Sequence, residues 1–167
     1  MKLPVQKITR ENFAPFGDLI ATDGADFHEI NDGNCTRFHD LAKVNIDLEE
    51  GRPLLNIFRA KPRAFPLTIE MMERHPIGSQ CFVPLNDQTY LVVVCSRDSE
   101  PSSENLQAFH VEGNQGVNYA PGTWHFPLIA PTGGDFLVVD RGGPGENCDI
   151  FRFDGDLPFL DISLNGA

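Results

Sequence analysis

Side chains that could carry out acid–base or metal chemistry gather in two short segments of the chain. The first segment holds Glu73 and His75, followed by Gln80, and the second holds His125 shortly after a Pro-Gly turn. Carboxylates and imidazoles can transfer protons near neutral pH, and both also bind divalent metals. These four residues are therefore the first candidates for an active site.

The spacing of these residues predicts that they meet. Glu73 and His75 are two positions apart, so on an extended strand both side chains point to one face. If Gly78 turns the chain, Gln80 rejoins that face at the start of the next strand. Two imidazoles with carboxylate and amide oxygens suit nickel or zinc. We therefore predict a divalent metal held by His75, His125, Glu73 and Gln80. In the alternative interpretation the two histidines are ordinary core residues, and Glu73 forms an ion pair with a nearby cation.

The elements that must position these residues are predicted to be short β-strands. The chain has 13 prolines and 15 glycines, and it alternates short apolar runs with turn residues. This pattern is typical of a sandwich or barrel, so the predicted class is an all-β barrel or double-sheet sandwich with a few short helices. Strands are expected near residues 54–60, 65–74, 79–85, 90–95, 136–140 and 148–153. Helical segments are expected at residues 9–17, capped by Thr9 and ended by Gly17, and at 101–106.

Composition excludes several classes of partner. The chain of 167 residues has 13 Lys and Arg against 24 Asp and Glu, a formal net charge of −11. Such a protein repels phosphate backbones and anionic membrane surfaces, so neither nucleic acid nor a membrane is expected as a partner. The length fits a single domain over residues 1–167. The first residues, MKLPVQKITREN, lack the apolar core of a signal peptide, so a cytoplasmic location is expected.

The four cysteines do not form a recognisable metal or disulfide pattern. None of them belongs to a Cys-x-x-Cys pair, and most lie beside apolar residues, which predicts buried reduced thiols. The polar, acidic residues 23–32 are expected to lie at the surface or against a partner chain. His39 with Asp40 could form a base and its orienting carboxylate, but neighbours on a strand point to opposite faces.

The two chemistry-bearing segments resemble the two motifs of the cupin superfamily of small β-barrels. The first cupin motif places metal ligands as His-x-His, followed by a glutamate before an apolar strand. Here Glu73 and His75 occupy the paired positions and Gln80 occupies that of the glutamate. The second motif, Gly-x-x-His after a proline-rich turn, matches Gly122 to His125.

A longer resemblance connects the chain with the ureidoglycolate lyase family. The similar stretches follow one another in order over about residues 1–153, and include residues 37–42, 58–60, 66–69, 73–80, 115–119, 124–125 and 140–143. The resemblance implies a homodimer that cleaves ureidoglycolate into glyoxylate and urea in allantoin and purine nitrogen degradation. It also implies a divalent metal, nickel in some members with zinc as the alternative, and no organic cofactor. Phe126 stands where many family members have a second histidine.

The resemblance also implies roles for individual residues. A carboxylate substrate could be gripped by the guanidinium of Arg59 or Arg141 through two hydrogen bonds. The alternative for Arg141 is an internal ion pair with Asp140. Gln80 could bind the ureido group of the substrate, and Tyr119 could offer its phenol. His125, His75 and Glu73 would then supply the base and the acid.

Two other functions remain open from the sequence. The first is a ureidoglycolate amidohydrolase, which would release ammonia from the same substrate. The second is a non-catalytic cupin-like module that binds a small acid or has a regulatory role.

Overall fold

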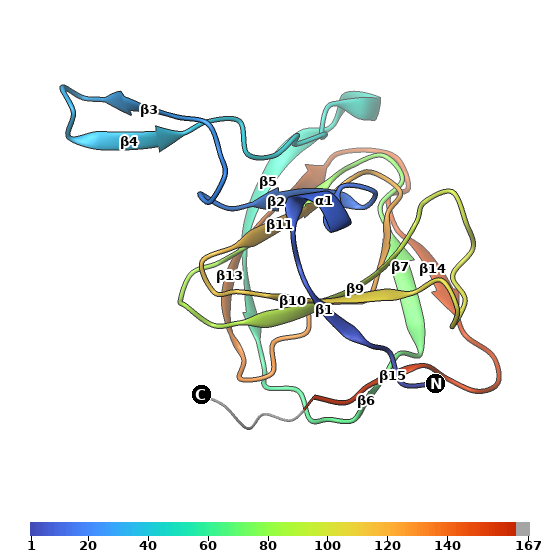
Figure 1. Cartoon of the computed structure of the whole chain (residues 1–167). Helices are drawn as coiled ribbons and strands as arrows, with labels where there is room; N and C mark the ends of the chain where they lie inside the picture. The colour runs from blue at the N-terminus through green and yellow to red at the C-terminus, as the bar shows by residue number, and fades with distance from the viewer. Residues whose placement is uncertain (163–167) are drawn as a thin grey trace.

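The computed structural model describes residues 1–162, and its regular secondary structure consists almost entirely of short β-strands (Figure 1). Two sheets form the body of the molecule: a six-stranded sheet in the order β1-β10-β9-β12-β7-β14 and a five-stranded sheet in the order β2-β11-β8-β13-β5. The predicted all-β class is confirmed. The strands are β1 (Val5–Lys7), β2 (Gly17–Ile20), β3 (Phe27–Ile30), β4 (Cys35–Phe38), β5 (Arg52–Ala60), β6 (Leu67–Thr68), β7 (Met71–Arg74), β8 (Gln80–Pro84), β9 (Tyr90–Cys95), β10 (Gln107–Val111), β11 (Gly116–Tyr119), β12 (Trp124–His125), β13 (Gly134–Gly142), β14 (Asp149–Arg152) and β15 (Phe159–Leu160).

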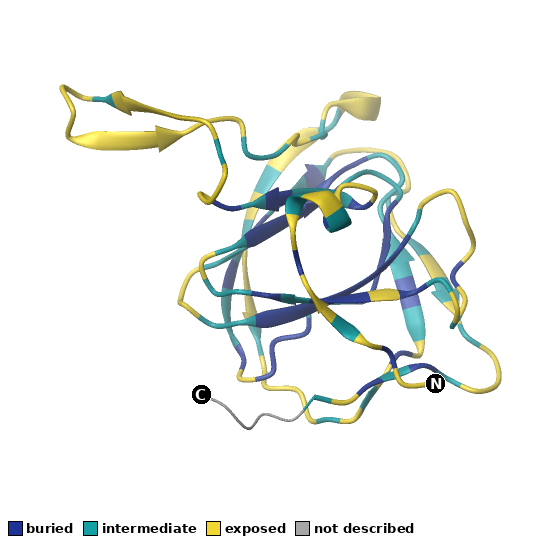
Figure 2. Cartoon of the chain, in the orientation of Figure 1, coloured by how far each residue is buried: buried dark blue, intermediate teal, exposed yellow. Residues whose placement is uncertain are grey.

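The main core lies between the two sheets. Inward-facing side chains of β9 and β10 meet those of β8, β11 and β13, and the phenyl ring of Phe136 packs edge-on against Tyr90 at 5.2 Å. Both of these rings are fully buried. Figure 2 shows the same pattern, with dark blue strands in the body and exposed loops around them. The architecture is a double-sheet sandwich of the cupin-like kind.

A second apolar cluster covers the outer face of the six-stranded sheet. Leu3 from the N-terminal segment, Ile69 from the middle of the chain and Leu160 from β15 pack there against the outward side chains of β9. β9 is consequently buried along its whole length. This confirms the expectation, drawn from its nearly all-apolar sequence, that residues 90–95 are covered on both faces.

Some local predictions were wrong in their bounds. The helix predicted over residues 9–17 is only α1 (Arg10–Phe13), with Thr9 as its N-cap in a capping box. It ends early because Pro15 has no backbone N–H to continue the helical hydrogen bonds. Gly17 begins β2 instead, where a Cβ would lie 1.9 Å from the carbonyl oxygen of Asn118.

Two further predicted elements differ as well. The strand predicted over residues 65–74 divides into β6 and β7 because the two halves pair with different strands, β15 and β12/β14. The segment 101–106 forms a turn without a helix, since the Asn105 side chain accepts a hydrogen bond from the Ser102 backbone N–H. The remaining helix is a short 3₁₀ turn, η1 (Leu48–Glu50). Within residues 1–162 no helix is long and apolar enough to cross a membrane.

The core predicts a large stability effect at Phe136. Replacing this fully buried ring by alanine should lower the free energy of unfolding by about 3–5 kcal/mol, as is usual for deleting a core phenylalanine. The matched control, Ile150→Ala, removes a side chain that is 54% exposed and should change it by no more than about 0.5 kcal/mol. Urea-induced unfolding measures both. Equal effects for the two variants would contradict the assignment of the core.

One element stands away from the body. β3 and β4 pair only with each other among the described strands and project outward as a two-stranded hairpin, which we call the arm (residues 27–38; Figure 1). All four residues of β4 are exposed, and Figure 2 shows the arm almost wholly in yellow. Residues 23–32 are mostly exposed in the single chain, which fits both predicted alternatives, a surface position and a position against a partner chain.

Candidate active site

Strand pairing brings the predicted site residues together inside the barrel. In the six-stranded sheet, His125 of β12 lies opposite Glu73 of β7. In the five-stranded sheet, Tyr119 of β11 lies opposite Gln80 of β8. His75 follows β7 directly, on the same face as Glu73. The two sheets therefore contribute facing side chains to one place, as the sequence spacing predicts.

Glu73, His75 and His125 form a compact cluster. One ligand atom from each of them lies within 4.8 Å of the others. The two imidazole rings are 5.3 Å apart between centroids, and Nε2 of His125 lies 3.5 Å from Oε1 of Glu73. This spacing fits a set of groups that hold a single small ion or polar atom between them.

Backbone carbonyls fix which nitrogen of each imidazole faces the cluster. Nδ1 of His75 lies 2.6 Å from the carbonyl oxygen of Asn147, and Nδ1 of His125 lies 3.0 Å from that of Thr123. Because a carbonyl oxygen only accepts hydrogen bonds, each Nδ1 carries the hydrogen and donates it. In the neutral ring, Nε2 is then left with a free lone pair.

The buried acceptors at this place lack partners within the described chain. Nε2 of His75, Nε2 of His125 and Oε1 of Gln80 are all buried without a hydrogen bond. Buried polar atoms are nearly always satisfied in folded proteins, and metal-ligating histidines usually donate their other nitrogen to a carbonyl, as both do here. The donor set therefore fits a divalent metal.

The electrostatics of the cluster favour an ionised carboxylate beside a protonated phenol. The contact with His125 contributes most to lowering the pKa of Glu73, against the opposite effect of burial. Burial raises the pKa of Tyr119 far above its usual value, and the Glu73 charge raises it further. The Tyr119 ring stacks on His125 at 4.3 Å and 11°, so it also holds the imidazole in place.

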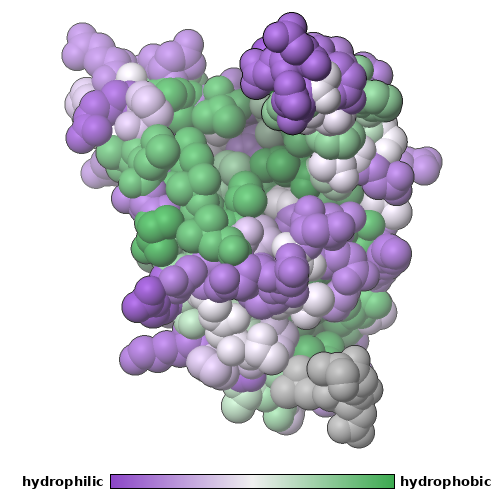
Figure 3. Space-filling view, turned by 90° about the vertical axis from the view of Figure 1, so that its left-hand side faces the viewer, coloured by the Kyte–Doolittle hydropathy of each residue, from purple (hydrophilic) through white to green (hydrophobic). Residues whose placement is uncertain are grey.

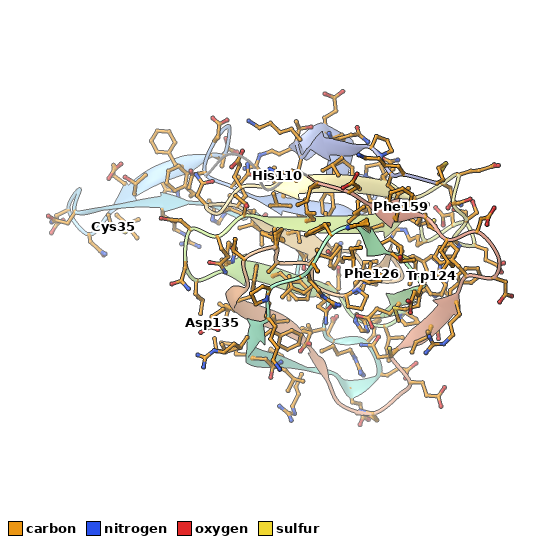
Figure 4. All side chains as sticks on the ribbon, turned by 90° about the horizontal axis from the view of Figure 1, so that it is seen from below. Cys35, His110, Trp124, Phe126, Asp135 and Phe159 are labelled. Carbon is orange, nitrogen blue, oxygen red and sulfur yellow. The ribbon has the colours of Figure 1, made fainter. Side chains whose placement is uncertain are left out.

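Glu73 and His125 of the cluster line a cavity of about 570 Å³, whereas His75 lines a separate, smaller cavity. That volume is in the range of small-molecule sites, which are mostly apolar with a few convergent polar groups. Glu73, Gln80 and His125 supply polar groups here, and Phe126 contributes to the wall (Figure 4 labels it beside Trp124). The remaining lining residues are Phe58, Arg59, Ala60, Lys61, Pro62, Arg63, Phe82, Tyr90, Tyr119, Pro127 and Leu128.

The two predicted arginines lie in different places. The side chain of Arg59 is 81% exposed at the rim of the cavity, and it donates two hydrogen bonds of 2.8 Å to Asp135. Arg141 is buried and lines a separate cavity of about 300 Å³, behind His75 and Gln80. Within residues 1–162, its side-chain hydrogen bonds go to the carbonyl oxygens of Leu48 and Glu49, so no ion pair with Asp140 is present.

Some residues at the site were not predicted from the sequence. Lys61 and Arg63 are exposed lining residues, and neither makes a side-chain hydrogen bond or ion pair within the described chain. The sequence did contain a signal for them. Arg59, Lys61 and Arg63 place three cationic side chains within five residues, which is unusual in so acidic a protein. The carbonyls of Thr123 and Asn147 could not have been found, since backbone groups carry no sequence signature.

The cysteines and His39 do not belong to the cluster. The four thiols are free; Cys81 and Cys95 are buried as predicted, whereas Cys35 and Cys148 are exposed. Burial raises the pKa of the Cys81 thiol to about 11. His39 is exposed at the base of the arm, where its ring lies 5.7 Å from that of His28.

The fold and the site together define a cupin-like protein with a small-molecule site. Two imidazoles, a carboxylate and an amide meet inside a small double-sheet barrel, next to a cavity. The family model described as "Ureidoglycolate lyase" matches residues 1–159. A ureidoglycolate lyase of Burkholderia mallei is 53% identical over 97% of this chain and 95% of its own length. The ureidoglycolate lyase of Pseudomonas syringae pv. syringae is 50% identical over 96% of this chain and 95% of its own length. That of Burkholderia cepacia is 51% identical over 88% of this chain and 84% of its own length. The chain belongs to the ureidoglycolate lyase family.

Proposed function

We propose that this protein is a carbon–nitrogen lyase that cleaves ureidoglycolate into glyoxylate and urea. The observation that carries the proposal is a group of buried acceptors on His75, His125 and Gln80 that lack hydrogen-bond partners within residues 1–162. They lie at the site that also holds the Glu73 carboxylate. Membership of the ureidoglycolate lyase family supports the choice of substrate.

The chemistry requires a base, an acid and an anchor for a carboxylate. Ureidoglycolate carries a hydroxyl, a urea nitrogen and a carboxylate on one carbon. The hydroxyl proton leaves, the C=O bond forms and the C–N bond breaks, and the departing urea nitrogen takes up one proton. The proton lost is equal to the proton gained, so one side chain that accepts and returns a proton is sufficient.

We propose that Glu73 accepts and returns this proton. Its pKa is lowered, so it is ionised and able to accept a proton at neutral pH. The Nδ1 hydrogen bonds to Thr123 and Asn147 hold the two imidazoles in a fixed orientation beside it. The apolar wall, including Phe126, limits water around the reacting atoms, which strengthens these electrostatic interactions.

The same cluster fits a divalent metal, which we propose is held by Nε2 of His75, Nε2 of His125, the Glu73 carboxylate and Oε1 of Gln80. Nickel or zinc suits this mixture of nitrogen and oxygen donors. When bound, the ion would lower the pKa of the substrate hydroxyl and help hold the carboxylate.

The exposed cations Lys61 and Arg63 are proposed to draw the substrate carboxylate to the cavity. The net charge of −11 gives no general attraction for an anion, so a local positive rim matters more. Replacing both residues by serine should lower kcat/KM about tenfold at low salt, the lower end of electrostatic steering, with little change in kcat. The measurement is steady-state kinetics over a range of salt concentrations.

The matched control removes the same charge elsewhere. Lys7 and Arg152 are exposed on β1 and β14 and do not line the cavity, so replacing both by serine should leave kcat/KM nearly unchanged. Equal losses in the two double variants would show that net charge, and not the rim, is responsible.

Turnover itself is tested by incubating the purified protein with ureidoglycolate and measuring glyoxylate. A protein that binds ureidoglycolate tightly and yields no glyoxylate would favour the non-catalytic binding module. A lyase should instead release glyoxylate continuously over many turnovers.

We also propose that residues 1–167 act as one domain, that the enzyme works in the cytoplasm in allantoin and purine nitrogen degradation, and that it is a homodimer. The homodimer has support in the exposed apolar side chains of the arm and of β5, among them Phe27 and Leu55, which are 63% and 72% exposed. Light scattering of the purified protein measures the number of chains in the assembly.

A further inference from the structure

The arm has little to stabilise it within its own chain. Its two strands pair with each other alone among the described strands, and an isolated two-stranded hairpin is only marginally stable in water. Its largest side chains form a ring pair, Phe27 with Phe38 at 5.9 Å, and both rings are exposed. Figure 4 shows Cys35 of β4 at the far end of the arm, well separated from the labelled residues of the body.

A second exposed apolar surface lies on the outer face of the five-stranded sheet. In the register of that sheet, Leu55 lies beside Val139, and Ile57 lies beside Leu137. Val83 continues the second row. Figure 3 faces the side on which β5 and β13 lie in Figure 1, and it shows a broad hydrophobic area there. We call this surface the outer patch; its members are Leu55, Ile57, Val83, Leu85, Leu137 and Val139.

The outer patch reaches the free edge of the sheet. β5 has nine residues and pairs only with β13 within the described chain, so its other edge is open. Long exposed edge strands with apolar side chains are usually covered, because they invite association with another chain. The rim of the large cavity follows directly at the end of this strand, at Arg59 to Arg63.

The charges of the two surfaces are complementary. Residues 23–40, which include the arm, contain five acidic side chains and one basic one, Arg37. Residues 52–63, which run along β5 and the rim, contain four basic side chains and no acidic one. Of these four, Arg59 is already paired with Asp135. The arm and its flanking residues, an acidic segment with exposed phenylalanines, thus match a basic edge beside an apolar patch.

We propose that the arm of one copy docks on the outer patch and basic β5 edge of a second copy of this chain. The proposal rests on the homodimer proposed above and specifies its interface. Two such contacts, related by a two-fold axis, would cover both arms and both patches. They would also place the partner's arm beside the cavity rim of each subunit.

Two variants, each with two apolar side chains replaced by aspartate, test the proposal. The arm variant is Phe27→Asp with Phe38→Asp, and the patch variant is Leu55→Asp with Ile57→Asp. Light scattering and sedimentation should find a dimer for the unmodified protein and a monomer for each variant at the same concentration. The control Ile150→Asp, on an exposed residue of β14, should remain a dimer. Circular dichroism checks that each variant keeps its strands.

Mixing the two variants gives the most specific result. The arm of the patch variant and the patch of the arm variant are both intact, so an equal mixture should form a heterodimer with one complete contact. The absence of a heterodimer would overturn the proposal. Formation of the heterodimer would be specific evidence, because mixing cannot restore contacts between two arms or between two patches.

A charge-reversal variant with two substitutions leaves the apolar side chains of both surfaces in place. Asp26→Lys, at the base of the arm, together with Glu29→Lys on the arm should raise the dissociation constant of the dimer at least about tenfold at low salt, since like charges would then face each other. An unchanged dissociation constant would overturn the proposed orientation. If the unmodified protein is monomeric at every concentration, both the proposed interface and the homodimer are overturned. This holds whether the arm is then free or binds a different partner. Glyoxylate release is measured separately, so failure here is distinct from failure of the proposed reaction.

Discussion

Replacing His125 by alanine is expected to lower the turnover of ureidoglycolate by at least about tenfold, and by as much as ~10²–10⁴-fold if Glu73 can no longer serve as the acid–base group without it. His125 is the most buried member of the cluster, at 2% exposure, and it contacts both other members. Without it, Glu73 loses the contact that contributes most to its lowered pKa. Tyr119 also loses the ring on which it stacks.

The control for this prediction is His110→Ala. His110 lies on β10, pairs across the sheet with Leu91 and does not line the cavity. Its replacement should leave turnover nearly unchanged. Thermal melting of both variants shows whether the fold survives. An unchanged rate in a folded His125→Ala protein would remove His125 from the site.

Loss of the divalent metal is the second change expected to have a large effect. The purified protein should contain about one nickel or zinc ion per chain, and chelation should abolish turnover until the ion is returned. His75→Ala should weaken metal binding by more than the ~10–100-fold that outer-shell changes usually cost, because a direct ligand is lost. Elemental analysis and equilibrium dialysis measure this without reference to activity.

Gln80 offers a variant that should act in the opposite direction. Its Oε1 atom is buried without a partner, so Gln80→Glu would place a second carboxylate against the ion and should tighten binding. Gln80→Leu should weaken it. His28→Ala, on the exposed arm, is the control and should bind metal as the unmodified protein does. Identical affinities in the unmodified protein and these three variants would show that Gln80 is not a ligand of the ion.

Much of the cluster could be predicted from the sequence because it depends on strand geometry. Glu73 and His75 share a face through the two-residue period of a strand, and Gln80 begins the next strand after a turn. His125 then joins them by pairing opposite Glu73. Short-range periodicity determines these relations, so a single sequence contains them.

Other features depend on contacts between distant segments, which periodicity does not describe. The ion pair of Arg59 with Asp135 joins residues 76 positions apart. Arg141 reaches back 93 positions to the carbonyl oxygen of Leu48. The acidic residues 23–32 could be placed at the surface by their composition, but composition alone did not predict that they extend into a projecting hairpin.

The most direct test of the proposed reaction is the nitrogen product formed from ureidoglycolate. Metal-analysed protein should release glyoxylate and urea in equal amounts, without ammonia, because only the bond between the carbinol carbon and the urea nitrogen breaks. Ammonia in place of urea would identify an amidohydrolase. No turnover with any divalent metal added would contradict the lyase activity itself.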